Sequence, residues 1–397
     1  MENYDLLHIV NKYGSSVYVY DSLKIKDQYT RLKKAFCRIE NLKINYAMKA
    51  LPNLAILKVM KDLGSGLDTV SIYEVQLGIM AGFKPSSIIY TPNGISMSEL
   101  SAAVVYGVQI NIDNLSLLEQ FGTQYPTIPV SIRFNPHIMA GGNNNISVGH
   151  IDSKFGISIH QLPHVLRIIE NTDMKINGLH MHTGSDILDI DVFLQASDIL
   201  FDIALEFPDL EFLDFGSGFK VPYKDGDDET NIEELGLKMT RKFNTFSNLY
   251  NKDLALIFEP GKYLVSQAGY FLTSVNVVKQ TTSTIFACIN SGFNQFIRPM
   301  FYNAYHDIEN LSNKEGLERF YTIVGNICES DTFATNRKLT EINEGDILCF
   351  KNAGAYCHSM ASNYNLRPRP AEVLWDGIKP TLIRRAETFE DMINTQQ

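Results

Sequence analysis

Residues 43–60, KINYAMKALPNLAILKVM, carry the pattern that decides the fold. Residues 43–47 form a short β-strand candidate, and residues 54–60 place apolar side chains at the i, i+3, i+4 spacing of an amphipathic helix. A strand followed by a helix is one βα unit, and repeated βα units build parallel sheets. Lys49 stands at the end of this strand candidate.

The same alternation continues to about residue 265. Eight strand candidates lie in this part of the chain, with helical stretches between them: residues 43–47, 66–71, 87–91, 108–114, 130–135, 176–182, 212–215 and 254–259. Eight βα units in a segment of this length predict an α/β fold of the TIM (β/α)8 barrel type. A doubly wound α/β sheet is the alternative, and it fits the pattern less economically.

The pattern changes after about residue 266, where no long amphipathic helix is expected. Short strand candidates follow one another through turn-rich connections, at residues 270–278, 285–289, 320–324, 346–350, 371–374 and 381–383. Residues 16–21 form a further strand candidate that precedes the barrel and can pair into the same β domain. We therefore expect a barrel over residues 22–265 and a β-sandwich or β-barrel domain made of residues 1–21 plus 266–397.

The composition is typical of a soluble globular protein and excludes some classes of partner. The chain has 397 residues, of which 45% are hydrophobic and 20% are charged, so it is too long to be a lone small binding module. Its 35 Lys and Arg residues are outnumbered by 45 Asp and Glu residues, giving a formal net charge of -10. This charge argues against general binding to nucleic acid or to an anionic membrane surface.

The sequence also indicates a compartment. The first residues lack the basic segment and apolar core of a signal peptide, and no stretch of about 18 apolar residues is present. The five cysteines are odd in number and have no C-x-x-C spacing, which argues against a disulfide framework and against a zinc ribbon. We expect a protein of the reducing cytoplasm.

Residues at the C-terminal ends of the predicted barrel strands form a chemically coherent set, and this is where TIM barrels place their active sites. They are Lys49, Asp68, Arg133, His180, His182, Ser185, Gly216, Ser217, Gly218, Glu259, Gly261 and Lys262.

Four of these features together predict pyridoxal 5'-phosphate. A lysine among apolar neighbours can form a Schiff base because desolvation frees its amine, although Lys49 taken alone is more simply a solvated surface lysine. The glycine loop, Gly216 to Gly218, can present N–H groups to a phosphate after strand seven. A carboxylate such as Glu259 can keep a pyridine nitrogen protonated. An imidazole, the fourth feature, can pack on the ring.

The pair His180 and His182 first suggests zinc. On a strand, the two side chains share one face, and no thiolate or carboxylate cluster stands nearby in the sequence. An imidazole that stacks on a ring, or a plain core histidine, is the better interpretation, and we expect no metal.

Several short motifs have a recognisable counterpart. They are NYAMKA at 45–50, HMHTGS at 180–185, LDFGSG at 213–218, EPG at 259–261, IRPMFY at 297–302, CES at 328–330, AGAY at 353–356, MASNY at 360–364 and RPAE at 369–372. With these motifs the chain resembles, over nearly its whole length, the pyridoxal phosphate-dependent decarboxylases of the alanine racemase-like fold. Within that family it is most similar to the subgroup that acts on diaminopimelate.

The resemblance implies roles for the barrel residues. Lys49 would bind the cofactor covalently, His182 would stack on its ring, and Glu259 would contact its pyridine nitrogen. Its phosphate would be held by Ser185, the glycine loop and Tyr356. The remaining cofactor-binding residues would be Asp68, Arg133, Gly261 and Lys262.

The resemblance also implies a homodimer with shared active sites. Cys328 and Glu329 would enter the site of the partner subunit, with Cys328 as the proton donor. Arg298 and Tyr302 match positions that bind the distal end of the substrate, where an arginine can hold a second carboxylate in a bidentate pair. The substrate-binding set is then Lys262, Arg298, Tyr302, Glu329 and Tyr356. Without its motif, Arg298 is more simply a partner in a salt bridge of the β domain.

Lys262 departs from the family pattern, which has Glu-Pro-Gly-Arg where this chain has Glu-Pro-Gly-Lys. Lysine keeps the positive charge but lacks the planar fork of arginine. It is either a tolerated variant or an indication of another substrate, and the retained Arg298, Tyr302, Glu329 and Tyr356 favour the former.

The expected activity is the decarboxylation of meso-2,6-diaminopimelate to L-lysine and CO2 in lysine biosynthesis. Two alternatives stay open: a decarboxylase of a related carboxylate-bearing amine, such as carboxynorspermidine or a siderophore precursor, and a non-catalytic decarboxylase-like regulator. The loop at residues 141–155 is rich in Asn and Gly, which fits a lid over the pocket and fits an inert surface loop almost as well.

Overall fold

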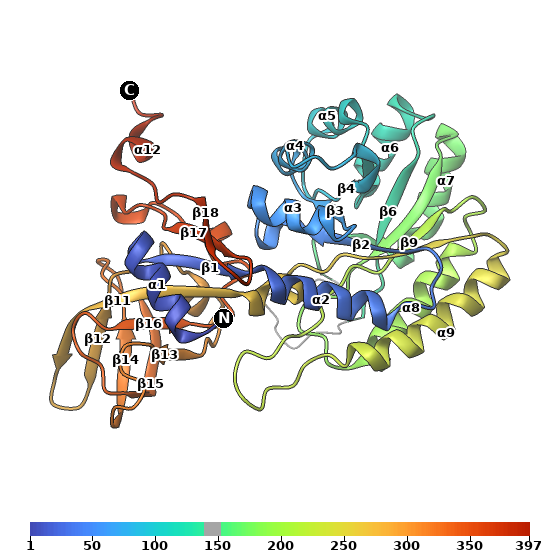
Figure 1. Ribbon diagram of the computed structural model, residues 1–397. Coiled ribbons are helices and arrows are strands. Elements are labelled where there is room, and N and C mark those ends of the chain that lie inside the picture. Colours follow the sequence, from blue (N-terminus) through green and yellow to red (C-terminus); the bar gives the residue numbers. More distant parts are fainter. Residues whose placement is uncertain (139–151) are drawn as a thin grey trace. The chain divides into compact units, whose positions relative to one another are not determined.

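The computed structural model describes residues 1–138 and 152–397, which form two compact units (Figure 1). The barrel unit comprises Asp27–Val221 and Asp228–Tyr263, and the β unit comprises Met1–Lys26, Pro222–Asp227 and Leu264–Gln397. Among the described helices, none is both long enough and apolar enough to cross a membrane.

The described part of the barrel unit contains a closed barrel of eight parallel strands, which confirms the predicted fold. The pairing of β5 with β6 and of β10 with β2 closes the ring. These strands are β2 (Leu42–Ala47), β3 (Gly66–Thr69), β4 (Ile88–Tyr90), β5 (Gln109–Ile112), β6 (Val130–Asn135), β8 (Ile176–Met181), β9 (Phe212–Asp214) and β10 (Ala255–Phe258). The two-residue strand β7 (Ile157–Ser158) pairs with β6 outside this ring.

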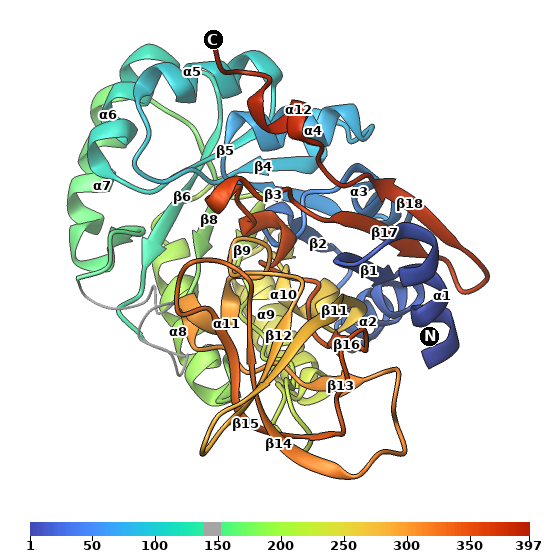
Figure 2. The same ribbon diagram turned by 90° about the vertical axis from the view of Figure 1, so that its left-hand side faces the viewer.

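Helices surround the barrel strands (Figure 2). They are α3 (Leu54–Asp62), α4 (Ile72–Met80), α5 (Met97–Tyr106), α6 (Leu115–Gln124), α7 (Leu162–Thr172), α8 (Ile190–Ala204) and α9 (Ile232–Tyr250), preceded by α2 (Ser22–Ala35) and followed by the short α10 (Lys262–Val265). Most begin at a residue whose side chain accepts a backbone N–H of the first turn, as Asn53 does from Ala55 and Ser71 from Glu74. These caps define where the helices begin.

Single turns of 3-10 helix connect several of these elements. They are η1 (Met48–Ala50), η2 (Pro85–Ser87), η4 (Ile159–Gln161), η5 (Ser266–Ala268), η6 (His358–Met360) and η7 (Tyr364–Leu366). The first of them places Lys49 directly beyond β2.

The β unit is built on one mixed sheet in the order β15-β14-β12-β11-β1-β17-β18, with β16 paired to β11 and β13. Strand β1 comes from the start of the chain and pairs with β11 and β17. The strands are β1 (Val17–Asp21), β11 (Gly269–Gln280), β12 (Ile285–Ile289), β13 (Ile308–Asn310), β14 (Glu318–Val324), β15 (Thr332–Thr340), β16 (Ile347–Phe350), β17 (Ala371–Trp375) and β18 (Pro380–Arg384).

The β unit also holds elements that sequence reasoning did not predict. Helix α1 (Asn3–Tyr13) packs Leu6, Ile9 and Val10 into a core with β1 and β11 residues. Strand β15 carries mainly polar residues, so no apolar run marks it, and β13 is only three residues long. The remaining helices, α11 (Arg298–Tyr302) and α12 (Phe389–Ile393), are short, as expected for this part of the chain.

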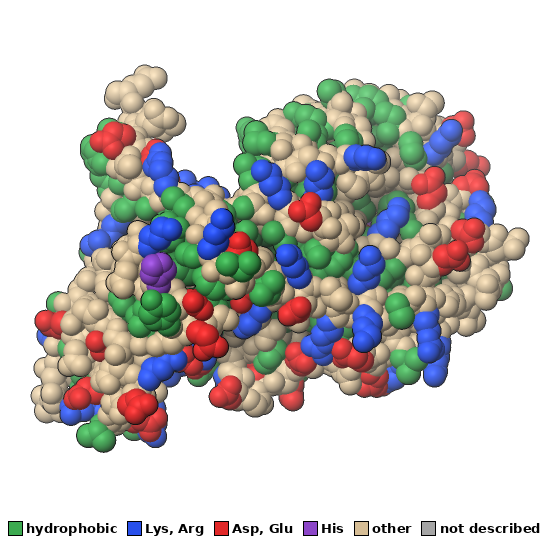
Figure 3. Space-filling view, viewed as in Figure 1, with side chains coloured by type: hydrophobic (Ala, Val, Ile, Leu, Met, Phe, Trp, Pro, Cys, Tyr) green, Lys and Arg blue, Asp and Glu red, His purple; other side chains and the backbone are tan. Residues whose placement is uncertain are grey.

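The predicted loop at residues 141–155 lies outside the described residues except for its last four positions. On the face drawn in Figure 3, acidic and basic side chains are intermixed, without a broad area of one charge. This distribution agrees with the moderate net charge of the chain.

Candidate active site

Lys49 and Asp68 form an ion pair at the C-terminal ends of two neighbouring strands, β2 and β3. Their Nζ and Oδ2 atoms are 3.2 Å apart, and the lysine side chain is 44% exposed while the aspartate is 1% exposed. Burial and the nearby Glu259 carboxylate raise the pKa of Asp68, whereas Lys49 opposes that rise. Lys49 is therefore an accessible amine that is held over a buried carboxylate, which is not the setting of an ordinary surface lysine.

Glu259 lies just beyond β10 and is buried against His180 from β8. Its Oε2 is 3.0 Å from His180 Nε2, while its Oε1 has no hydrogen-bond partner among the described residues. Burial acts to raise the pKa of Glu259, but the His180 ring and Lys49 outweigh it and lower the pKa to about 2. The site thus contains a charged, buried carboxylate that His180 and Asp214 flank.

Asp214 is the second buried carboxyl group beside Glu259. Burial and then the Glu259 charge raise the pKa of Asp214 well above its usual range, although Gly216 N–H donates to its Oδ1 over 2.9 Å. His180, Asp214 and Glu259 each offer one atom within 4.8 Å of the others, a spacing that a metal ion needs. Because the pKa of Asp214 is raised and His180 is hydrogen-bonded to Glu259, we interpret the cluster as a hydrogen-bonded group that surrounds the Glu259 carboxylate.

His182 follows β8 and faces the glycine loop. Its Nδ1 accepts a hydrogen bond from Ser217 N–H over 3.3 Å, and burial, Arg133 and Lys49 lower the pKa of His182 well below its usual value. A neutral ring that accepts at Nδ1 carries its proton on Nε2. At Gly216 an added Cβ would lie 2.5 Å from this Nδ1, so glycine allows the close approach of ring and loop.

The glycine loop is closely packed against the turn that contains Ser185. Gly218 has φ 119, and a Cβ there would lie 2.0 Å from the carbonyl oxygen of Gly184. Of the three loop amides, those of Gly216 and Ser217 already donate to Asp214 and His182. Of the predicted phosphate contacts, this leaves the Gly218 amide and Ser185.

Arg133 and Gly261 also lie at the strand ends where they were predicted. Arg133 is buried on β6 with its guanidinium carbon 5.0 Å from the centre of the Phe155 ring. Burial lowers the pKa of Arg133, although Glu259 and Asp113 oppose that change. An added Cβ at Gly261 would lie 3.1 Å from that of Ala50, so glycine keeps the turn after β10 close to the turn that carries Lys49.

Lys262, the residue that departs from the family pattern, forms an ion pair with Asp186. Asp186 directly follows Ser185 and has φ 61, in the left-handed region that few residues other than glycine adopt. The side chains are 11% and 29% exposed. In this structure the Lys262 charge is thus engaged by the protein itself.

In the β unit, Arg298 is buried at the start of α11 between two tyrosine rings. Its guanidinium carbon lies 5.6 Å from the ring centre of Tyr223 and 5.5 Å from that of Tyr302. One terminal nitrogen donates to the Tyr223 hydroxyl over 3.4 Å, while Nε has no hydrogen-bond partner among the described residues. Among the described salt bridges, none pairs Arg298 with a carboxylate. Arg298 is therefore not the salt-bridge partner within the β domain that this residue without its motif would suggest. A buried cation with an unpaired donor suits a carboxylate ligand.

Cys328 and Glu329 lie on an exposed segment of the β unit. Cys328 Sγ donates to Asn365 Oδ1 over 3.2 Å, and Glu329 accepts from the Tyr364 hydroxyl over 2.6 Å. Tyr356, the last of the predicted residues, lies in the loop after β16 with φ 57. The hydrogen bonds to Asn365 and Tyr364 hold Cys328 and Glu329 in one orientation, although both residues are exposed.

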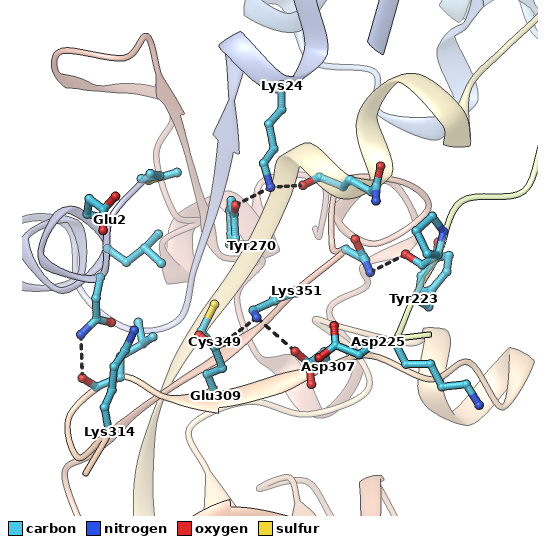
Figure 4. A pocket seen from close by; sticks show the side chains of 18 residues that line it. Glu2, Lys24, Tyr223, Asp225, Tyr270, Asp307, Glu309, Lys314, Cys349 and Lys351 are labelled. Atoms are coloured by element: carbon cyan, nitrogen blue, oxygen red, sulfur yellow. Dashed lines mark hydrogen bonds and ion pairs between the residues drawn. The ribbon is translucent and has the colours of Figure 1, made fainter. Parts of the chain in front are cut away.

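A separate polar cavity of about 430 Å³ lies within the β unit (Figure 4). In Figure 4 the Lys351 ammonium contacts Asp307, and the Lys24 ammonium donates to the Tyr270 hydroxyl. None of the predicted site residues lines this cavity, although Tyr223, which contacts Arg298, does.

Comparison with known proteins decides the family. Residues 22–266 match the family model described as "Pyridoxal-dependent decarboxylase, pyridoxal binding domain". The chain belongs to the pyridoxal-dependent decarboxylases. It is thus a carboxy-lyase, and pyridoxal 5'-phosphate is its cofactor.

This decarboxylase has curated relatives that match it over nearly the whole chain. It is 39% identical to the diaminopimelate decarboxylase of Methanothermobacter thermautotrophicus, with 99% of this chain and 94% of the relative covered. It is 34% identical to that of Campylobacter jejuni, with 99% and 98% covered. The solved diaminopimelate decarboxylase of Helicobacter pylori, which is complexed with L-lysine, superimposes with a TM-score of 0.90 at 31% identity and covers 98% of both chains.

The barrel residues of this decarboxylase fit the cofactor on structural grounds. The charged Glu259 carboxylate is complementary to a protonated ring nitrogen, and Lys49 is an accessible amine at the same barrel end. The neutral His182 offers a ring face. The glycine at position 218 allows the glycine loop to approach the backbone of Gly184, which a side chain there would prevent.

Sequence reasoning missed three residues of this decarboxylase that the structure places against predicted ones. Asp186 pairs with Lys262, and Tyr223 contacts Arg298. Asp214 lies beside Glu259, whose charge raises the pKa of Asp214. Asp214 lies within the LDFGSG motif and Asp186 directly follows the HMHTGS motif, so both positions were usable signals. Tyr223 has no such signal, because only the fold brings residues 222–227 into the β unit.

Proposed function

We propose that this decarboxylase converts meso-2,6-diaminopimelate to L-lysine and CO2 in lysine biosynthesis. The observation that carries the proposal is Arg298, a buried guanidinium whose Nε lacks a partner among the described residues. Meso-2,6-diaminopimelate has a second carboxylate at its far end, and a bidentate pair with Arg298 would satisfy that charge. The full-length similarity to diaminopimelate decarboxylases supports the same assignment.

In the proposed mechanism, the barrel residues prepare the reacting end of the substrate. Lys49 would hold the cofactor through its amine. Bound pyridoxal phosphate supplies an electron sink for the electron pair that remains when CO2 leaves. Glu259, whose pKa is lowered to about 2, stays charged and holds the proton on the pyridine nitrogen. His182 would stack on the ring and Ser185 and Gly218 would bind the phosphate, while Asp68 orients the Lys49 amine.

We further propose that the active enzyme is a homodimer in which Cys328 and Glu329 of one subunit complete the site of the other. Their exposure in the single chain supports this arrangement. The Cys328 thiol then donates the proton that replaces CO2, and Glu329 with Tyr356 contacts the substrate. All five cysteines are free thiols, which supports a cytoplasmic location for this enzyme.

Replacing Arg298 with Ala is expected to raise KM for meso-diaminopimelate roughly 10-fold to 100-fold, the effect of losing a charged hydrogen-bond pair, while kcat changes less. Steady-state kinetics with a lysine assay measures both constants. Arg319→Ala, at an exposed ion pair of β14, is the matched control and should leave both unchanged. An Arg298→Ala enzyme with the original KM would show that this arginine does not bind the substrate.

Replacing Cys328 with Ala is expected to lower kcat roughly 100-fold, as loss of a positioned proton donor does, without weakening cofactor binding. Cys37→Ala, at another exposed cysteine, is the control. Mixing inactive Lys49→Ala and Cys328→Ala subunits should restore about a quarter of the activity, because half of the random dimers have one intact site of two. No recovery on mixing would contradict a shared site.

A substrate panel tests the function itself. CO2 release and the amine product are measured with meso-diaminopimelate, L-ornithine, L-arginine, L-lysine and carboxynorspermidine. Lysine formed from meso-diaminopimelate alone is the expected result. CO2 from a different substrate would move the specificity assignment to other residues, with Lys262 as the first candidate.

A further inference from the structure

The ion pair between Lys262 and Asp186 connects two loops at the active end of the barrel. Lys262 opens α10 just after β10, and Asp186 follows Ser185 just after β8. Strand β9 lies between β8 and β10 in the barrel, and the glycine loop follows it. The pair therefore joins the loops on either side of the predicted phosphate contact.

The loop that contains Asp186 is packed directly against the glycine loop. Ile187 N–H donates to Gly218 O over 2.9 Å, and Gly184 approaches Gly218 so closely that a Cβ on Gly218 would lie 2.0 Å from the Gly184 carbonyl oxygen. A shift of residues 184–187 must therefore also move Gly218, whose amide is the part of the glycine loop that is left for the phosphate.

The backbone conformation at Asp186 would be stabilised by such a restraint. Its φ of 61 lies in the left-handed region, which costs free energy for residues with a Cβ and persists when surrounding contacts hold it. Asp186 is one residue from Ser185, the other predicted phosphate ligand. The lysine at position 262, which is mostly buried, supplies a contact that holds Asp186 in place.

We propose that Lys262 is a positioning residue for cofactor binding: through its ion pair with Asp186 it holds Ser185 and Gly218 in place for the phosphate. The Lys262 ammonium is then not the free cation that binds the phosphate. This inference rests on the proposed function, because it assumes that Ser185 and Gly218 bind pyridoxal phosphate.

The two roles of Lys262 predict opposite effects of Asp186→Asn. If the pair positions the loops, removing the carboxylate raises the dissociation constant for pyridoxal phosphate roughly ten-fold, as expected for a lost charge-assisted hydrogen bond. If Lys262 is a direct phosphate ligand, the same change removes a competing negative charge and lowers the dissociation constant. Asparagine adopts the left-handed conformation as readily as aspartate, so the variant leaves the backbone unchanged.

The experiment titrates cofactor-free enzyme with pyridoxal phosphate, measures binding by absorbance, and records the 31P NMR signal of the bound phosphate. Lys262→Met should weaken binding as much as Asp186→Asn, the double variant should be no weaker than either single variant, and Lys262→Arg should stay within about two-fold of the original because it keeps the pair. The 31P signal should titrate with pH in Lys262→Met as it does in the original protein. Asp209→Asn, which breaks the exposed pair with Lys252, is the control and should change nothing.

Tighter or unchanged binding in Asp186→Asn, or an altered 31P titration in Lys262→Met, would overturn the positioning role. If Asp186→Asn does not fold, the Lys262→Met titration alone still decides between the two roles. An original protein that binds no pyridoxal phosphate would contradict the proposed function itself, so the two failures are distinguishable.

Discussion

Lys49→Ala is expected to lower kcat/KM by at least about 1,000-fold, because no other amine among the described residues stands over the buried Asp68 carboxylate. The remaining site can still attract the cofactor through its phosphate contacts and Glu259, but the covalent attachment is lost. Single-turnover assays with purified variant and meso-diaminopimelate measure the chemical step. Mass spectrometry of the borohydride-reduced protein shows whether the cofactor is attached at this lysine.

Lys43→Ala is the matched control, since Lys43 is an exposed lysine on the same strand, β2. It should keep the original activity and the original mass of the reduced protein. If Lys49→Ala retained most of its activity, the assignment of Lys49 and with it the whole proposed mechanism would have to be abandoned.

Glu259→Gln is expected to lower kcat roughly 100-fold to 1,000-fold, the usual effect of removing a charge that stabilises the transition state. Glutamine keeps the size of the side chain and removes the charge that keeps the ring nitrogen protonated. Because the pKa of Glu259 is lowered from 4.5 to about 2, this carboxylate stays charged across the assay range. Protonation of Glu259 should therefore cause no loss of activity in the original enzyme down to about pH 5.

Glu206→Gln, at an exposed glutamate beyond α8, is the control for this change. The informative measurement is kcat as a function of pH for both variants and the original enzyme, together with the absorbance of the bound cofactor. A Glu259→Gln enzyme with unchanged kcat and absorbance would show that the carboxylate does not contact the ring nitrogen.

The barrel could be predicted from the sequence because its strands are buried on both faces and therefore appear as short apolar runs at regular intervals. Predicted residues 130–135 coincide with β6, and residues 254–259 extend β10 by one residue at each end. Strand β15 escaped prediction because its residues are mainly polar, and its pairing with β14 is decided by tertiary contacts.

Side chains at the ends of barrel strands were equally accessible to sequence reasoning, since the fold itself brings Lys49, Asp68 and Glu259 together. The contacts between particular pairs of side chains could not be predicted from the sequence. That Glu259 shares its surroundings with His180 and Asp214, and that Lys262 pairs with Asp186, depends on side-chain directions and distances of a few ångströms. No motif encodes such distances.

The position of Arg298 has a consequence for the end of the catalytic cycle. In the proposed reaction the carboxylate that leaves is the one at the reacting end, so L-lysine retains the carboxylate that Arg298 binds. Because this residue then holds substrate and product equally, its contribution to binding does not lower the barrier of the chemical step. L-lysine is accordingly expected to be a competitive inhibitor that depends on Arg298, whereas cadaverine, which has no carboxylate, should inhibit far less. The flux through this enzyme would then fall as its own product accumulates, without a separate regulatory site.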